Sequence, residues 1–463
     1  MRPFEIYLAI ACAAAIVWPA LFGVRPRRGI MVLVLLGMVV VQWQVEGFRW
    51  PLLPIYLVAL GLAIGDFIML ERELPWYRRA GRGVFGLMGL VVAVAPALLF
   101  PVPELPVPSG PLTIGTATVE LTHPELEERY GPNPGGARRL TTQIWYPAGD
   151  TEGVDPERWI WDMDVVGSAL AEHVGVPGFL FNSARYTDSH SYPDVPVDAG
   201  GFPLVIFSHG WAEFRTISLP QIENLVSQGY VVIAIDHPYA AVATRVGEEV
   251  IRLDPMALGE EDADDEAIAA AEASLIETMA TDVALVIEEV TAGDEGAYGS
   301  VARAIDAGTI GVWGHGLGGG AALQVCLTDE RCDAVAAQDP VVETLPDPVL
   351  ATTAARPMLL MRSDGWRDTA NDAVLRGIVA RSETLTYWVG VRGTDSSDFV
   401  ATPLVSPIAD RIGLRGPIDS DRVMVINRRY VTGFFDRFLL GTGSAALDTA
   451  AFPEVDVEVI DQR

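Results

Sequence analysis

Three glycines at alternate positions, Gly314, Gly316 and Gly318, form the motif in this chain that is most similar to one found at catalytic sites. An apolar run, Thr309–Trp313, precedes them, and a run with helical character, Ala321–Val325, follows them. A strand, a tight glycine turn and a helix in this order make a nucleophile elbow, written G-x-S-x-G, which presents a serine for acyl transfer. Here Gly316 stands at the serine position. The sequence therefore predicts an elbow that keeps its backbone and lacks its hydroxyl.

The positions of the histidines limit the chemistry further. The chain has six histidines, and none lies after position 315. In elbow enzymes the triad follows the chain order serine, acid, histidine, so the base lies after the acid. We therefore expect two of the three catalytic side chains to be absent.

Other polar residues near the elbow are expected to be structural. His315 precedes the nucleophile position and is expected to pack under the elbow. His209 is expected to bond to nearby backbone. Ser363 and Ser396 are expected to be loop serines without a histidine partner.

The elements that position the elbow alternate between strands and helices. Strands are expected at Leu204–Phe207, Tyr230–Ile235, Thr309–Trp313, Ala334–Ala337, Met358–Met361 and Leu385–Val389, and helices at Leu219–Gln228, Met279–Val290 and Tyr430–Leu440. Continuous apolar strands between helices predict a mainly parallel sheet covered on both faces. Two further strands, Gly115–Leu121 and Arg139–Tyr146, are expected to pair antiparallel at one edge. Residues 150–200 are expected to form a lid-like insertion.

The first hundred residues are of a different kind. They contain four apolar runs, Phe4–Val24, Ile30–Val45, Trp50–Leu70 and Val84–Phe100. A helix needs about 20 residues to cross a bilayer. The sequence therefore predicts four transmembrane helices in residues 1–100, and three spans with one interfacial segment is the alternative. Residues 101–110 are a proline-rich linker, and residues 111–463 form the second domain.

The loops between the apolar runs indicate orientation. Arginines gather between the first and second runs and between the third and fourth runs, at Arg25, Arg27, Arg28, Arg72, Arg78, Arg79 and Arg82. Arginine-rich loops usually stay in the cytoplasm. We therefore expect an integral plasma-membrane protein whose domain after Phe100 is extracytoplasmic.

The charge of the chain excludes one class of partner. The formal charge is −29, from 32 basic residues, all arginine, and 61 acidic residues. Residues 1–100 hold nine arginines and five acids, so the remainder carries about −33. Such an acidic domain is not suited to binding nucleic acid.

Two cysteines, Cys326 and Cys332, lie six residues apart. In an oxidising compartment they are expected to form a disulfide. With the opposite orientation they would be buried thiols. Cys12 lies in the first apolar run and is expected to pack there.

Four stretches together resemble one family. They are Gln143–Ala148, Phe207–Gly210, Gly314–Gly319 and Arg392–Thr394 with Asp398 and Phe399 after it. In this order they resemble the platelet-activating factor acetylhydrolase group of the α/β-hydrolases, close to dienelactone-hydrolase-like esterases. The resemblance covers about residues 110–440 and implies an α/β-hydrolase fold. It also implies a serine esterase of lipids with short acyl chains that uses no metal and no cofactor.

The resemblance assigns roles position by position. Gly316 takes the nucleophile position, and Asp339 takes the acid position at the end of the next strand. Asp364 is the alternative acid position in this fold. Ser396 takes the histidine position, with Asp395 as the other choice.

The oxyanion hole follows in the same way. The backbone N–H groups of Trp211 and Leu317 take its two positions.

Three functions remain open. The first is a catalytically inactive protein that binds a lipid-like or small ester ligand. The second is an active esterase that uses substitute residues, and the third is a membrane interaction protein.

Overall fold

The computed structural model describes the chain except residues 24–28, 69–74, 133, 261, 293–295, 444–446 and 462–463 and the side chains of residues 66–68. The chain divides into two compact units. The first unit consists of Met1–Pro103, Phe179–Tyr186 and Val405–Ile408. The second consists of Glu104–Gly178, Thr187–Leu404 and Ala409–Arg463.

The first unit is built on four helices. They are α1 (Pro3–Phe22), α2 (Ile30–Glu46), α3 (Leu53–Ile68), which follows the 3₁₀ turn η1 (Trp50–Leu52), and α4 (Trp76–Leu99). Among the described residues, α1 and α4 are long and apolar enough to cross a membrane, whereas α2 and α3 are shorter apolar helices. Two candidate spans are thus present, and four spans stay a prediction.

Large apolar side chains point outward from all four helices. They include Leu21 on α1, Leu33 on α2, Leu57 on α3 and Phe85 on α4, with Leu33 75% and Phe85 76% exposed. Water-soluble domains rarely expose apolar side chains over such a wide surface. These outer faces therefore suit contact with lipid.

A polar cluster closes one end of this bundle. The Arg49 guanidinium contacts the Glu5 carboxylate at 2.5 Å. The Glu46 carboxylate accepts the N–H groups of Phe4, at 2.9 Å, and Glu5, at 3.2 Å, at the start of α1. These bonds satisfy helix N–H groups that would otherwise lack acceptors. Of the arginines used to predict orientation, Arg25, Arg27, Arg28 and Arg72 lie outside the described residues.

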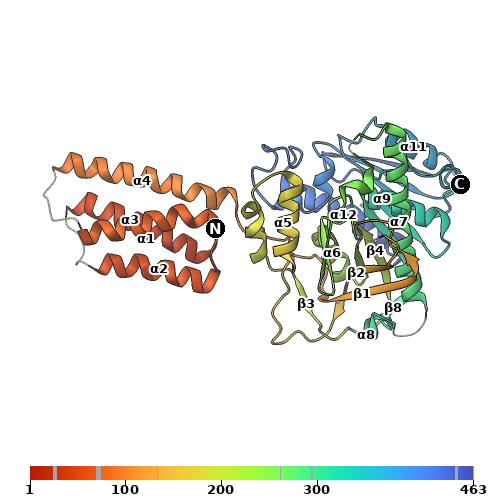
Figure 1. Ribbon diagram of the computed structural model, residues 1–463, viewed down its shortest axis with the longest axis horizontal. Coiled ribbons are helices and arrows are strands. Elements are labelled where there is room, and N and C mark those ends of the chain that lie inside the picture. Colours follow the sequence, from red (N-terminus) through yellow and green to blue (C-terminus); the bar gives the residue numbers. More distant parts are fainter. Residues whose placement is uncertain are drawn as a thin grey trace. The chain divides into compact units, whose positions relative to one another are not determined.

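A ten-stranded sheet runs through the second unit, in the order β12-β11-β10-β9-β8-β4-β5-β2-β1-β3 (Figure 1). The strands are β1 (Thr113–Glu127), β2 (Ala137–Ala148), β3 (Ser191–Pro193), β4 (Phe202–Ser208), β5 (Val231–Asp236), β8 (Ile305–His315), β9 (Ala334–Gln338), β10 (Met358–Arg362), β11 (Thr386–Val391) and β12 (Val455–Ile460). Strands β4, β5, β8, β9, β10 and β11 are parallel. The mainly parallel sheet is confirmed, and so is the antiparallel β1–β2 pair.

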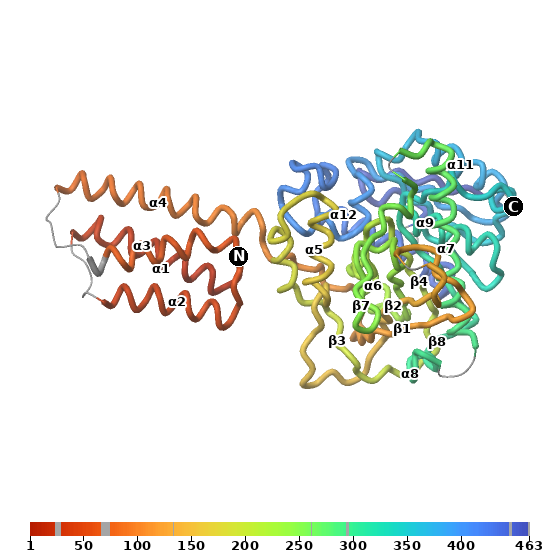
Figure 2. Tube along the Cα trace, in the orientation of Figure 1, coloured from red at the N-terminus to blue at the C-terminus, as the bar shows by residue number. Residues whose placement is uncertain are grey.

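Helices follow the strands of the second unit along the chain (Figure 2). They are α5 (Met163–Val174), α6 (Leu219–Ser227), α7 (Asp265–Thr291), α8 (Gly299–Ala302), α9 (Gly316–Thr328), α10 (Asp347–Leu350), α11 (Ala370–Val379) and α12 (Ser420–Phe438), with 3₁₀ turns η2 (Gly178–Tyr186), η3 (Pro255–Leu258), η4 (Ser396–Phe399) and η5 (Thr402–Leu404). Helices α7 and α9 share one apolar core with strands β4, β8 and β9. Helix α6 packs with α12.

Two antiparallel additions were not predicted from the sequence. Strand β12 pairs with β11 at the far edge of the sheet. Strands β6 (Ala243–Val246) and β7 (Glu249–Arg252) form a separate hairpin. In β12 the charged residues Asp456 and Glu458 alternate with apolar ones, and β6 and β7 are only four residues long, so neither addition forms a continuous apolar run in the sequence.

The insertion between β2 and β4 is more ordered than a loop. Helix α5 and turn η2 occupy its middle, and β3 pairs in parallel with β1. The Tyr146 hydroxyl donates to the carbonyl of Val195 at 2.7 Å and ties the returning chain to β2. Part of η2, Phe179–Tyr186, belongs to the first unit. The expected lid-like insertion is therefore tied to β2 where the chain returns to the sheet.

Residues 104–110 of the proline-rich stretch are held against the second unit. The Ser109 N–H donates to the Asn224 side chain at 3.0 Å, and the Gly110 N–H donates to the Ser227 hydroxyl at 3.0 Å. The Arg428 side chain donates to the Val107 carbonyl at 2.8 Å. Proline lacks an N–H, but these neighbouring residues supply donors and acceptors that fix the segment.

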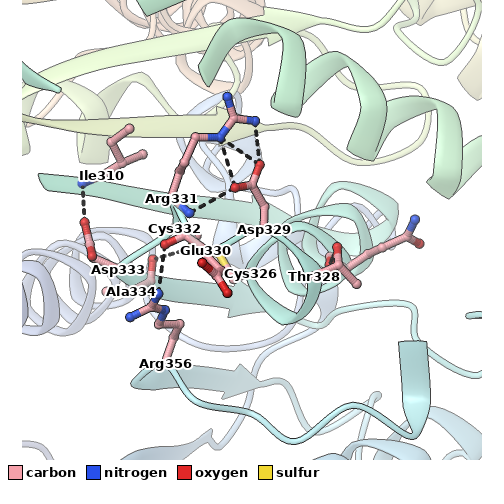
Figure 3. The surroundings of a disulfide bond; sticks show 11 residues. Ile310, Cys326, Thr328, Asp329, Glu330, Arg331, Cys332, Asp333, Ala334 and Arg356 are labelled. Carbon is pink, nitrogen blue, oxygen red and sulfur yellow. Dashed lines mark hydrogen bonds and ion pairs between the residues drawn. A yellow bond between two sulfur atoms is a disulfide. The ribbon is translucent and has the colours of Figure 1, made fainter. Parts of the chain in front are cut away.

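A disulfide joins Cys326 at the end of α9 to Cys332 before β9, with Cα atoms 5.1 Å apart, as predicted (Figure 3). The loop that it closes is also fixed by ion pairing, since the Arg331 guanidinium contacts the Asp329 carboxylate at 2.6 Å. The Asp333 carboxylate accepts the Ile310 N–H at 2.9 Å and attaches the loop to β8.

The disulfide makes a direct test possible. In the unfolded, unreduced protein we expect one titratable thiol, that of Cys12, and three after reduction. Replacing both Cys326 and Cys332 by serine should lower the free energy of unfolding by about 2 kcal/mol, because the bridge restricts a short loop of the unfolded chain. Three thiols before reduction would contradict the disulfide.

Candidate functional site

The elbow joins the end of β8 to the start of α9. Gly316 has φ +55°, the left-handed conformation that favours glycine. A Cβ at Gly314 would lie 2.1 Å from the carbonyl oxygen of Gly318, and one at Gly318 would lie 2.2 Å from that of Ser208. A Cβ at Gly316 would meet only the Cα of Gly210, at 3.7 Å, among described atoms within 4 Å. The flanking glycines are thus required by close packing, whereas the space for a serine side chain at position 316 is open.

The roles of Trp211 and Leu317 as oxyanion donors stay a prediction. The backbone around both residues is compatible with those roles. Trp211 follows β4 in the loop whose Gly210 borders the elbow, and Leu317 lies in the first turn of α9. N–H groups in the first turn of a helix have no partner within the helix. Within the described part of the chain, neither the Trp211 N–H nor the Leu317 N–H is bonded to another protein group.

Asp339 follows β9 at the same edge of the sheet. Its carboxylate accepts the Ser363 N–H at 2.8 Å and the Ser363 hydroxyl at 2.6 Å. Burial raises the pKa of Asp339, against hydrogen bonds from Ser363 and Ser396 that lower it. Asp364, the alternative acid, instead accepts the Gly393 N–H at 2.5 Å and is exposed. Asp339 is therefore the carboxylate that lies beside Ser396.

His315 is buried beside the elbow, and its ring also faces the loop after β11. Its Nε2 lies 2.9 Å from the Ser396 hydroxyl oxygen and 3.1 Å from the Ser396 carbonyl oxygen. Its Nδ1 lies 2.8 Å from a carboxylate oxygen of Glu213. The expectation that Ser396 lacks a histidine partner is therefore wrong. The loops after β4, β8 and β11 meet at the carboxyl edge of the parallel sheet, so residues distant in sequence become neighbours there.

Glu213 and His315 form a buried ion pair. Burial alone would raise the pKa of Glu213, but the imidazolium of His315 holds it below its usual range. Burial alone would lower the pKa of His315, but the Glu213 carboxylate and then Asp339 raise it. The Glu213 oxygen lies off the direction of the ring N–H, so the contact is electrostatic rather than a linear hydrogen bond. Its other oxygen accepts the Gly210 N–H at 2.7 Å, which orients the carboxylate.

A second serine–histidine–acid set lies deeper in the sheet. The Ser208 hydroxyl lies 2.8 Å from Nε2 of His237, whose Nδ1 lies 2.8 Å from Asp282. All three side chains are buried, and Arg138 pairs with Asp282 at 2.7 Å. A substrate cannot reach this set, so it stabilises the interior.

His209 has the structural role expected of it. Its Nδ1–H donates to the Gly210 carbonyl at 2.7 Å, and its Nε2 accepts the His237 N–H at 3.1 Å. Burial lowers the pKa of His209 to about 4, which keeps the ring neutral. The ring thus holds the loop that carries Trp211.

Sequence reasoning missed one member of the site, Glu213. Its only signal is its place, three residues after Gly210 in the loop that follows β4. Hydrogen-bonding partners across loops have no fixed spacing in sequence, and only the fold shows that this carboxylate faces His315.

Known proteins share this architecture. The family described as platelet-activating factor acetylhydrolase, isoform II, matches residues 105–441. The chain is also similar to a solved structure, a ferulic acid esterase from Streptomyces cinnamoneus, with 24% identity and a TM-score of 0.63 over 77% of this chain and 99% of that chain. At that identity the similarity shows the fold. With the family match spanning most of the chain, this protein belongs to the platelet-activating factor acetylhydrolase isoform II family of the α/β-hydrolases.

Proposed function

We propose that this protein is a membrane-anchored, extracytoplasmic member of its family that binds a lipid-like or small carboxylic ester and does not use the elbow nucleophile. The observation that carries the proposal is the elbow itself. Gly316 keeps the left-handed backbone and the open space of the nucleophile position without a hydroxyl. The site has thus lost a reactive atom rather than its shape.

The chemistry follows from the missing groups. In a serine triad the base removes the hydroxyl proton, and the acid orients the base and stabilises its cation. Without an oxygen at position 316, no acyl group can be attached there. The N–H groups of Trp211 and Leu317 are still able to donate to a carbonyl oxygen, which supports binding of an ester.

The anchoring rests on the first unit. Its four helices expose broad apolar faces, and α1 and α4 reach the length of a span. The disulfide between Cys326 and Cys332 supports an extracytoplasmic second unit, because such bonds persist in oxidising compartments. We therefore propose that both termini lie outside the plasma membrane.

An active esterase with substitute residues is the second candidate function. One observation favours it, the contact of His315 with an exposed serine, Ser396.

Binding is tested with a short-chain aryl amide, a non-hydrolysable analogue of an aryl ester, by calorimetry on the full chain in detergent. We expect saturable binding that is lost in Gly316→Phe, because the ring fills the space beside Gly210. Gly413→Phe is the matched control, since Gly413 also has positive φ, at +75°, and open surroundings. Equal binding by both variants, or none by the native protein, would contradict the proposal.

Restoring the family's triad should restore turnover. Gly316→Ser with Ser396→His should hydrolyse short-chain aryl esters at least tenfold faster than Gly316→Ala with Ser396→His, because Asp339 contacts position 396. Either change at Gly316 places a side chain at φ +55° and should reduce stability by about 1–3 kcal/mol. If the folded double variant shows no gain, Asp339 is not aligned for catalysis.

Orientation is tested by labelling intact cells with a membrane-impermeant thiol reagent. Gly201→Cys, at an exposed site of the second unit, should be labelled before lysis. Arg78→Cys, in the arginine-rich first turn of α4, should be labelled only after lysis. The reverse pattern would place the second unit in the cytoplasm.

A further inference from the structure

We propose that Ser396, His315 and Glu213 form an acyl-transfer site displaced from the elbow, in which Ser396 is the nucleophile, His315 the base and Glu213 the residue that orients the base. The inference rests on the proposed ester-binding site and adds chemistry to it. Its substrates are carboxylic esters whose carbonyl reaches the open space above Gly316.

The first support is the reach and exposure of the three groups. Nε2 of His315 lies 2.9 Å from the Ser396 hydroxyl oxygen, within the range expected between a base and its nucleophile. Ser396 is exposed, whereas His315 is 5% exposed. A substrate can therefore meet the hydroxyl while the base stays shielded from water. The buried set around Ser208 has similar distances but lacks this access.

The second support is the rigidity of the loop that carries Ser396. The Asp398 carboxylate accepts the N–H groups of Asp395, at 2.8 Å, and Gly416, at 2.7 Å. The Asn427 side chain donates to the Asp398 carbonyl at 2.8 Å. These bonds hold turn η4 at both ends, so Ser396 is placed by the scaffold rather than by chance.

The third support is the polarity around the imidazole. Glu213 lies 2.8 Å from Nδ1 and favours a proton on that nitrogen. Nε2 faces both the carbonyl and the hydroxyl oxygen of Ser396, so loss of the Nε2 proton leaves a lone pair directed at the hydroxyl. The negative charges of two carboxylates, Glu213 and then Asp339, raise the pKa of His315. They favour the imidazolium, the species that forms when the base accepts a proton.

The reaction balances with these groups and water. The Ser396 Oγ forms a bond to the ester carbonyl carbon as its proton passes to Nε2 of His315. The tetrahedral intermediate collapses, the bond to the alcohol oxygen breaks, and His315 returns its proton to that oxygen. Water then attacks the acyl-serine with His315 as base, and the acid product leaves with Ser396 regenerated.

The test is covalent labelling of the native full chain by a fluorophosphonate, with the modified peptide identified by mass spectrometry. We expect the label on Ser396, none in Ser396→Ala, and unchanged labelling in the matched control Ser397→Ala, whose hydroxyl donates instead to the Leu414 carbonyl. His315→Gln should slow labelling at least a hundredfold, the usual scale of general-base catalysis.

A pH profile separates a catalytic role of Glu213 from a structural one. The labelling rate should rise with pH as His315 loses its proton, with a midpoint above the ordinary histidine value of about 6.5. In Glu213→Gln the midpoint should fall, because the carboxylate that raises the pKa of His315 is gone. If the pH midpoint of labelling is unchanged in this variant, Glu213 takes no part in proton transfer through His315.

A second measurement needs no variant at His315. Ser396→Cys places a thiol against Nε2, and its alkylation by iodoacetamide at pH 7 should be at least tenfold faster than that of Ser397→Cys, at the position whose hydroxyl donates instead to the Leu414 carbonyl. Equal rates, or a fluorophosphonate label on another residue, would overturn the inference. Binding of the amide analogue without any label on Ser396 would overturn it while leaving the proposed function intact; absence of binding would remove both.

Discussion

The close approach of the β4 loop to the first turn of α9 is the constraint on which the site depends. A side chain at Gly318 would overlap the carbonyl of Ser208, so backbone must touch backbone there. That contact brings Gly210, Glu213 and the start of α9 together at the carboxyl edge of the sheet. Because the neighbouring strands are parallel, the loops after β9 and β11 arrive at the same edge. The close packing at these glycines therefore determines where the polar side chains of the site come together.

The same constraint explains how the elbow keeps its backbone with glycine at position 316. Gly314 and Gly318 fill places where no Cβ fits, whereas position 316 has room for one. Glycine at position 316 supplies no reactive oxygen, and it adopts without strain a left-handed backbone that other residues occupy at a cost. The architecture and the chemistry of this elbow are therefore separable.

Much of the fold and the elbow could be predicted from the sequence because both depend on local sequence patterns. Apolar runs gave the parallel strands, the glycine spacing gave the elbow, and six residues of separation gave the disulfide. The contact between His315 and Ser396 spans 81 residues and carries no local signal. The sequence could not show that the buried ring of His315 faces the loop after β11. Strand β12 was not predicted because charged residues alternate with apolar ones along it.

The polar side chains at the site form one connected network, in which Nδ1 of His315 makes an ion-pair contact with Glu213 rather than a hydrogen bond. A buried carboxylate without partners would be costly, yet Asp339 retains Ser363 and Ser396, and Glu213 retains His315 and the Gly210 N–H.

The Glu213 pKa is lowered, so its contribution to stability is present above its unfolded value and fades as pH falls. The His315 pKa is raised, so its contribution is present below its unfolded value and fades as pH rises. The pair therefore stabilises the fold most between about pH 4.5 and 6.5, the two reference values. Above that window the neutral imidazole gives up part of this stability and gains a lone pair at Nε2, so the pH that favours a base at Ser396 is also the pH at which the ion pair weakens.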